Sequence, residues 1–240
     1  MKIKNIYSPN FNNNRRPNKS IKFLIIHYTG MQSERVSMIR LCNPKFKVSA
    51  HYVINQKGKI YRLVNEDKIA WHAGKSCWGK FKDLNKTSIG IELVNKGHRF
   101  GYTNFKKEQL SSLIKICNNL IKKYKIKKEN ILGHSDIAPL RKIDPGEKFP
   151  WKKLANKKIG IWHNCKTKSL KKFRKIKISF KFKLEFINTL KKIGYCFNKK
   201  KKADSLKIIK AFQMHYRKEL INGIIDKECL IIAKNILKKI

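Results

Sequence analysis

The strongest constraint on the fold of this chain is a short apolar run that ends in a histidine and is stopped by a glycine. Residues 21–30 read IKFLIIHYTG. A run this short, closed by Gly30, is typical of a buried strand rather than of a helix. Because side chains alternate along a strand, Phe23, Ile25 and His27 share one face. The sequence therefore predicts a buried strand that presents an imidazole at its end.

Three further segments have the pattern of strands. Residues 50–64, AHYVINQKGKIYRLV, form two alternating runs around QKGK and predict a hairpin. Residues 87–95 (TSIGIELVN) and 130–136 (NILGHSD) predict two more short strands, with His134 near the end of the second.

One helix is predicted between these strands, at residues 104–126, with Asn104 as a candidate N-cap. Its apolar residues recur at helical spacing and its lysines occupy the other face. These apolar residues are Leu110, Leu113, Ile114, Cys117, Leu120, Ile121 and Tyr124. Strands and helices thus mix along the chain, which predicts an α/β or an α+β fold for this part.

The last part of the chain predicts a small three-helix domain. Apolar residues recur at helical spacing within residues 184–195, 205–220 and 226–237. Ser205 and Asp226 are candidate N-caps of the second and third helices. A module of this size is small for independent stability, but such domains do fold.

The predicted organisation has four parts. They are a polar leader at residues 1–19, the α/β domain at 20–155, a lysine-rich linker at 156–182 and the helical module at 183–240.

The chain is strongly basic, with 58 Lys and Arg residues against 15 Asp and Glu residues and a formal net charge of +43. Such a charge attracts polyanions, including nucleic acid, anionic lipid and anionic cell-wall polymers. Lys, Ile and Asn can all be encoded with A and T alone, so a biased genome gives the same composition. No arginine-rich recognition helix is present, so no specific nucleic-acid binding is expected.

The cysteines and the hydrophobic segments bear on the compartment. The six cysteines stand apart, without CxxC or zinc-finger spacing, which favours reduced thiols over a disulfide scaffold. No stretch approaches the run of about 20 apolar residues of a membrane span. The basic N-terminus lacks the apolar region of a secretory signal. A cytoplasmic protein is therefore expected, with the periplasm or cell envelope, reached by non-classical export, as the alternative.

Two histidines and an aspartate are candidates for a metal site. His27 and His134 each fall at the end of a predicted strand, and Asp144 precedes Pro145, which favours an extended backbone. Taken alone, His27 is more typical of a satisfied core residue. Together, two imidazoles and a carboxylate suit a catalytic zinc ion, with the fourth position left for water.

Two charged residues accompany these candidates. Glu92 falls within an apolar predicted strand, where a carboxylate is costly unless it is paired or functional. Lys142 lies two residues before Asp144, so in an extended chain both side chains point to one face. A solvated surface position is the alternative for Lys142, as for most lysines of the chain.

Five ordered segments resemble a known family. They are FLIIHYTG, SAHYVINQKGKIYRLV, AWHAG, LNKTSIGIELVN and ILGHSDIAPLRKIDPGEKFPW, and they span residues 20–155. They are similar to the zinc-dependent N-acetylmuramoyl-L-alanine amidases, whose fold is shared with peptidoglycan recognition proteins and phage-type amidases. The resemblance is greatest to the branch whose third zinc ligand is aspartate rather than cysteine.

The resemblance implies an α/β zinc amidase domain at residues 20–155, with a mixed central sheet and flanking helices. In this domain His27, His134 and Asp144 are expected to bind one zinc ion. The resemblance also implies that Glu92 handles the protons of the catalytic water and that Lys142 stabilises the oxyanion. The expected reaction is hydrolysis of the amide between the lactyl group of muramic acid and L-alanine. The substrate is peptidoglycan or an anhydro-muropeptide, and the sequence does not choose between them.

Weaker candidates match family positions near the substrate groove. His51, Trp71 and His72 are each expected either to contact substrate or to support the pocket structurally. Asn85 is expected to help bind the peptide stem. Tyr28 and Thr29 are expected in the groove or behind the first ligand. Asp136 is expected to orient its loop rather than to bind metal, and His215, which has no motif around it, is expected to be structural or at the surface.

The C-terminal helices resemble the three-helix peptidoglycan-binding domain of some family members. The matching text is LKKIGY, IIKAFQMHY and GIIDKECLIIAKNIL. The segment YCFNKKKKADSL departs from the more acidic, glycine-containing loop of that domain, so the fold is expected and ligand binding is left open. A wall-binding module favours the cell envelope, against the missing signal segment.

Two other functions fit parts of the sequence. A non-catalytic peptidoglycan-binding protein would have lost zinc ligands, whereas all three positions, Glu92 and Lys142 are present. A nucleic-acid-binding protein is suggested by the charge alone and predicts salt-dependent, zinc-independent binding to any polyanion.

Overall fold

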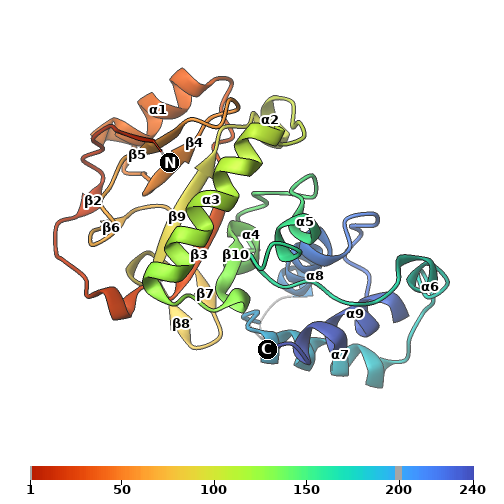
Figure 1. The fold of residues 1–240 in the computed structure, drawn as a ribbon. Helices are drawn as coiled ribbons and strands as arrows, with labels where there is room; N and C mark the ends of the chain where they lie inside the picture. The colour runs from red at the N-terminus through yellow and green to blue at the C-terminus, as the bar shows by residue number, and fades with distance from the viewer. Residues whose placement is uncertain (1, 198–201) are drawn as a thin grey trace.

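The computed structural model describes residues 2–197 and 202–240 (Figure 1). The strands are β1 (Ile3–Asn5), β2 (Phe11–Asn12), β3 (Phe23–Tyr28), β4 (Tyr52–Ile54), β5 (Ile60–Arg62), β6 (Ile69–Ala70), β7 (Cys77–Trp78), β8 (Phe81–Lys82), β9 (Ser88–Leu93) and β10 (Ile131–Gly133). The helices are α1 (Glu34–Cys42), α2 (Gly97–Phe100), α3 (Lys107–Tyr124), α4 (His134–Ile137), α5 (Trp151–Ala155), α6 (Thr167–Lys171), α7 (Phe180–Ile193), α8 (Lys202–Tyr216) and α9 (Lys227–Leu237).

A mixed sheet forms the centre of the fold, as predicted. Within the described ranges its six strands run in the order β1-β5-β4-β9-β3-β10. The hairpin β4–β5 is antiparallel, whereas β3 pairs in parallel with both β9 and β10. Figure 1 shows α3 lying across one face of this sheet, with α7, α8 and α9 gathered at the side of β10. No helix in the described part of the chain has the length and apolar character needed to cross a membrane.

Strand β3 lies between β9 and β10, and its two faces pack into two different cores. Leu24 and Ile26 belong to the core beneath α3. Phe23 and Ile25 belong to a second core. This alternation confirms the period-two pattern read from the sequence, and it puts His27 on the face of Phe23 and Ile25, at the carboxyl end of the strand.

The second core is shared between the sheet and the C-terminal helices. It joins Phe23 and Ile25 of β3 to Phe186 and Leu190 of α7 and to Phe212 of α8. The three predicted helices of the module are all present. They do not stand apart from the sheet, because both parts bury their apolar side chains in the same core.

Two of the predicted N-caps differ from the structure. Helix α3 begins at Lys107, after Phe105 has entered the core, so the predicted cap Asn104 is wrong. Helix α8 begins at Lys202 and contains Ser205. The predicted cap of α9 is confirmed, because the Asp226 carboxylate accepts a hydrogen bond of 2.9 Å from the backbone N–H of Cys229.

Residues 1–19 are not a separate polar leader. Strand β1 pairs in parallel with β5, and β2 pairs antiparallel with β6. The side-chain amide of Asn10, 2% exposed, donates to the backbone carbonyls of Leu41, Asn43 and Val48. These stabilising contacts are made with backbone groups far away in the sequence, so no local apolar pattern predicts that residues 1–19 are ordered.

The predicted linker, residues 156–182, is ordered and packed. Ile159 contributes to the core beneath α3, and Ile161 and Leu170 contribute to the shared core. Lys177 forms an isolated bridge with Asp226 at the start of α9. A few apolar residues, irregularly spaced among lysines, thus anchor this segment without giving it a periodic pattern.

The expectation of reduced cysteines is wrong for one pair. Cys77 in β7 and Cys196, which follows α7, form a disulfide with a Cα–Cα distance of 6.0 Å. Their sequence separation is 119 residues, so only the docking of the C-terminal helices against the β7–β8 hairpin brings them together. Cys42, Cys117, Cys165 and Cys229 are free thiols.

Candidate active site

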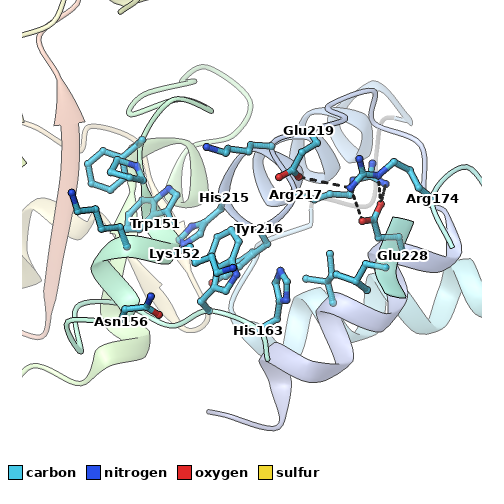
Figure 2. Close-up of a pocket in the computed structure, with 17 residues that line it drawn as sticks. Trp151, Lys152, Asn156, His163, Arg174, His215, Tyr216, Arg217, Glu219 and Glu228 are labelled. Atoms are coloured by element: carbon cyan, nitrogen blue, oxygen red, sulfur yellow. Dashed lines mark hydrogen bonds and ion pairs between the residues drawn. The ribbon is translucent and has the colours of Figure 1, made fainter. Parts of the chain in front are cut away.

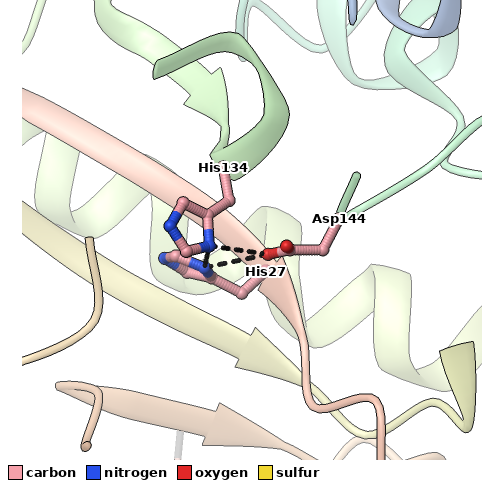
Figure 3. Close-up of side chains that lie close together, drawn as sticks. All are labelled: His27, His134 and Asp144. Carbon is pink, nitrogen blue, oxygen red and sulfur yellow. Dashed lines mark hydrogen bonds and ion pairs between the residues drawn. The ribbon is translucent and has the colours of Figure 1, made fainter. Parts of the chain in front are cut away.

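Three side chains from three separate segments converge at the carboxyl end of the central strands (Figure 3). His27 ends β3, His134 begins α4, and Asp144 lies in the loop before α5. Nδ1 of His27 lies 2.9 Å from Nδ1 of His134, and these nitrogens lie 3.1 and 3.0 Å from Oδ2 of Asp144. All three residues are buried. The structure therefore brings together the three predicted metal ligands.

A chain of hydrogen bonds fixes the tautomer of His27. The Ser88 hydroxyl donates to the carbonyl of Leu84 at 2.6 Å, so its oxygen accepts from Nε2 of His72 at 3.2 Å. Nδ1 of His72 is then the acceptor for Nε2–H of His27 at 3.0 Å. Nδ1 of His27 therefore carries a free lone pair, directed towards His134 and Asp144.

His134 is oriented in the same way. Its Nε2 lies 3.1 Å from the carbonyl oxygen of Ala73, an acceptor, so Nε2 carries the hydrogen. Nδ1 of His134 then presents its lone pair to the shared point. Histidine ligands of metals commonly have their second nitrogen held in this manner.

The start of α4 differs from the sequence prediction but serves the site. His134 begins a helix instead of ending a strand, because the Asp136 carboxylate accepts a 2.8 Å hydrogen bond from the backbone N–H of Gly133. The turn this creates directs the imidazole back towards β3. Asp136 thus orients the loop, as expected, and is not one of the three converging residues.

The spacing and charge of the three side chains fit a divalent metal ion. Ligand atoms bound tetrahedrally at about 2.0–2.1 Å lie roughly 3.3 Å apart, close to the observed separations. Burial, with a contribution from His134, lowers the pKa of His27 to about 4, which keeps this imidazole neutral at pH 7. Although burial opposes it, contact with His134 and His27 holds the pKa of Asp144 well below its usual range. A neutral imidazole and an ionised carboxylate are the forms that bind metal.

A cleft of about 300 Å³ opens beside the three side chains. Glu92 and Lys142 both line it, together with His72, Tyr28 and Thr29. Glu92 is opposite His27 in the parallel register of β9 and β3. The predicted catalytic pair thus shares a cavity with the candidate metal ligands.

Glu92 is unusual among the acidic residues of the chain. Its side chain is buried, and Oε2 has no hydrogen-bond partner within residues 2–197 and 202–240. Burial, with repulsion from Asp144, raises the pKa of Glu92 to about 8, and the charge of Lys142 opposes that rise. An isolated carboxylate in such a place is costly to the fold, which is typical of a group kept for chemistry.

Two arginines at the cleft were not predicted. Arg40 reaches it from α1, and Arg141 reaches it from the position before Lys142. Nε of Arg141 donates to the carbonyl of Lys75 at 3.0 Å, and its NH2 group also contacts the carbonyl of Ala73. Arg141 could have been predicted as a cleft residue, because it is next to Lys142 in the sequence. Arg40 could not, because α1 lacks a clear apolar stripe that would indicate which of its faces points to the cleft.

The four weaker candidates take different places. His72 lines the cleft and orients His27. His51 is fully buried, with Nδ1 accepting from the N–H of Gly90, so it cannot contact a substrate in this arrangement. The side-chain oxygen of Asn85 accepts from the backbone N–H groups of His72 and Ala73 at 3.0 and 2.7 Å.

Asn85 therefore supports the segment whose carbonyl group orients His134. Trp71 donates its indole N–H to the side chain of Asn12 at 2.8 Å. Among the described residues that line the cleft, neither Asn85 nor Trp71 is present. The structure places both in supporting contacts.

Comparison with known proteins identifies close relatives. The chain is 36% identical over 232 residues to the N-acetylmuramoyl-L-alanine amidase AmiD of Escherichia coli, covering 91% of this chain and 83% of AmiD. It is 36% identical over 167 residues to the 1,6-anhydro-N-acetylmuramyl-L-alanine amidase AmpD of Haemophilus influenzae, covering 62% and 88% of the two chains.

Solved structures agree with these similarities. The complex of E. coli AmiD with anhydro-N-acetylmuramic acid-L-Ala-D-gamma-Glu-L-Lys superposes with a TM-score of 0.81 and 35% identity, over 95% of this chain and 92% of that one. AmpDh3 from Pseudomonas aeruginosa superposes with a TM-score of 0.80 and 30% identity, over 95% and 96%. The sequence profile of the N-acetylmuramoyl-L-alanine amidases matches residues 17–147, which include all three candidate ligands, Glu92 and Lys142. This chain belongs to the N-acetylmuramoyl-L-alanine amidase family.

Proposed function

We propose that this chain is a zinc-dependent amidase that hydrolyses the bond between the lactyl group of muramic acid and L-alanine in muropeptides. The observation that carries the proposal is one cleft lined by His134, Asp144, Glu92 and Lys142, with His27 in contact with the first two. Among the described residues, Oε2 of Glu92 has no hydrogen-bond partner. The AmiD complex contains an anhydro-muropeptide substrate, which supports a substrate of this class. The positive charges of Arg40 and Arg141 at the cleft suit the carboxylates of a peptide stem.

His27, His134 and Asp144 would hold the metal ion. Two imidazoles and one carboxylate are a donor set typical of catalytic zinc, whereas sets made of carboxylates and carbonyls suit Mg²⁺, Ca²⁺ or Mn²⁺ better. Bound there, zinc would supply Lewis acidity, which polarises an amide carbonyl and brings the pKa of water close to 7.

Glu92 is the group that moves protons. Its carboxylate lines the cleft and, among the described residues, has no partner at Oε2 to release, so it accepts a proton from the attacking water and returns it to the departing amine of L-alanine. A raised pKa suits this exchange, because a general base works best when its pKa lies near the operating pH. Lys142 stabilises the negative charge that develops on the carbonyl oxygen.

Hydrolysis of a defined muropeptide tests the proposal. Purified full-length protein loaded with zinc should release the peptide L-Ala-D-γ-Glu-L-Lys from its anhydro-N-acetylmuramic acid conjugate, as detected by mass spectrometry. The same peptide on reducing N-acetylmuramic acid then measures the sugar preference. Cleavage at another bond, or binding without cleavage by the zinc-loaded protein, would contradict the proposed reaction.

Replacing Lys142 by methionine tests the role of its charge. We expect kcat to fall by about 10²–10³, the usual cost of removing one oxyanion-stabilising donor. The zinc content should stay unchanged, because Lys142 is not among the converging ligands. The control is Lys122→Met on the exposed face of α3, which removes the same charge elsewhere. A kcat within twofold of wild type for Lys142→Met would mean that Lys142 is a solvated surface residue without a catalytic role.

The compartment is a further part of the proposal. A disulfide persists in oxidising compartments, so Cys77–Cys196 supports the periplasm or cell envelope over the cytoplasm. Alkylation of denatured protein from its native host, without reductant, should then leave these two cysteines unlabelled. Labelling of both would favour the cytoplasm.

A further inference from the structure

Among the described residues, the carboxylate of Asp136 accepts three hydrogen bonds, and two of them come from the C-terminal part of the chain, from the residue Tyr195 just after α7 and from His215 in α8. Within the catalytic part of the chain, Oδ2 accepts from the backbone N–H of Gly133 at 2.8 Å. From the C-terminal part, the Tyr195 hydroxyl donates to Oδ1 at 2.6 Å and Nδ1 of His215 donates to Oδ2 at 2.7 Å. Asp136 is 1% exposed, so these contacts replace all of its hydration.

The position of Asp136 determines the position of His134. Both residues belong to α4, a single turn of four residues, which is too short to be stable alone. The turn is held by the bond from Gly133 to Asp136, which ties the end of β10 to the third residue of the helix. Any shift of the Asp136 carboxylate therefore moves the start of α4, where Nδ1 of His134 faces His27 and Asp144.

The two donors from the C-terminal part are themselves rigid. Figure 2 shows Trp151, His215 and Tyr216 side by side. The imidazole of His215 stacks on both rings, with centroids 3.9 Å from Trp151 and 4.0 Å from Tyr216. Tyr195 is buried and packs edge-on against Trp78 at 4.8 Å, next to the Cys77–Cys196 disulfide.

We propose that Tyr195 and His215 are positioning residues for the metal ligand His134. Both lie outside residues 17–147, the region that matches the amidase profile. The C-terminal helices then form part of the support of the catalytic site and are not only a separate binding module. The inference rests on the proposed function, since it assigns these residues a role in holding the metal-binding geometry.

Tyr195→Phe is the most selective test, because it removes one hydroxyl and keeps the buried ring. Loss of a group hydrogen-bonded directly to a metal ligand typically costs 10–100-fold in metal affinity or activity. Tyr195 acts one contact further away, through Asp136, so we expect the Kd for zinc, measured by competition with a chromophoric chelator, to rise by up to about tenfold. We also expect kcat at saturating zinc to fall while KM for the muropeptide stays near the wild-type value.

Tyr124→Phe is the matched control. The Tyr124 hydroxyl donates to Glu66, a carboxylate that also accepts from Tyr52 and Lys123, so the variant again removes one of three side-chain or backbone donors. This cluster lies away from α4. The control should lower the melting temperature by a similar amount and leave the Kd for zinc unchanged.

His215 gives an independent comparison. His215→Ala removes the donor and should weaken zinc binding, whereas His215→Asn places an amide N–H near the position of Nδ1 and should restore part of it. A merely structural role of His215 would not distinguish donor from non-donor replacements through zinc affinity. This pair decides the question if Tyr195→Phe does not fold.

The outcomes separate this inference from the proposed function. Tyr195→Phe and His215→Ala with wild-type Kd for zinc and wild-type kcat, but lower melting temperatures, would overturn the positioning role and leave the amidase intact. Wild-type protein that binds no zinc, or binds it and cleaves no muropeptide, would instead contradict the proposed function itself.

Discussion

Asp144→Ala is expected to abolish both metal binding and hydrolysis. Its Oδ2 lies within 3.1 Å of both imidazole Nδ1 atoms, so the variant removes the only negative charge among the three converging groups. A catalytic metal contributes several kcal/mol to the transition state, and each ~1.4 kcal/mol is a factor of ten. We therefore expect kcat/KM to fall by about 1000-fold or more, with zinc, measured by atomic emission, lost from the purified protein.

The fold should survive this substitution. The carbonyl of Asp144, which accepts from the backbone N–H of Ser135 at 2.8 Å, is unchanged in the variant. Asp67→Ala is the control, since it removes a partly exposed carboxylate paired with Arg15 away from the site. Chelation of the wild type should reproduce the loss, and added zinc should reverse it. A folded Asp144→Ala protein that keeps stoichiometric zinc would show that the metal binds elsewhere.

The central sheet could be predicted from the sequence because its strands carry their own signals. Phe23, Ile25 and His27 alternate with Leu24 and Ile26, and the structure puts the two sets on opposite faces of β3. The hairpin β4–β5 and the strand β9 were predicted for the same reason. Elements stabilised by distant partners were not predictable, as β1 and the packed segment 156–182 show.

The candidate site likewise has a part that could be predicted from the sequence and a part that could not. Its five principal residues follow from ordered motifs. His134, Asp144, Glu92 and Lys142 line one cleft, and the fifth residue, His27, contacts two of them. The contacts that orient them link distant segments: His72 to His27 and Tyr195 to Asp136. No motif near Tyr195 or Cys196 indicates a partner in the sheet domain. The resemblance therefore predicts ligands, whereas their support depends on how this chain packs.

Glu92→Gln is expected to separate catalysis from metal binding. Glutamine has the same shape but cannot accept a proton from water, and removal of a general base typically costs 10²–10⁴-fold in rate. We expect kcat to fall within that range while zinc content stays at the wild-type level, because Glu92 is not among the converging ligands. The measurement is kcat with the anhydro-muropeptide substrate, alongside bound zinc per chain. Wild-type kcat with normal zinc would exclude Glu92 as the base.

The same substitution has a predictable effect on stability, because the buried carboxylate of Glu92 has no partner for Oε2 in the part of the chain that the structure describes. Burial, with repulsion from Asp144, raises its pKa from 4.5 to about 8 in the folded, metal-free protein. A raised folded-state pKa means that the native state binds the proton more tightly than the unfolded state does. Protonated Glu92 therefore stabilises the folded state relative to ionised Glu92. This contribution to the unfolding free energy is fully present below about pH 4.5 and is lost as the pH rises towards 8.

Glutamine carries no titratable proton, so the Glu92→Gln variant should not lose unfolding free energy at this position as the pH rises. For zinc-free proteins, the difference in unfolding free energy between variant and wild type should shift in favour of the variant between pH 5 and pH 8, as measured by urea denaturation. A pH-independent difference would mean that Glu92 titrates normally and is not isolated from solvent. If Glu92→Gln is more stable but less active than the wild type, then Glu92 destabilises the fold and is needed for catalysis.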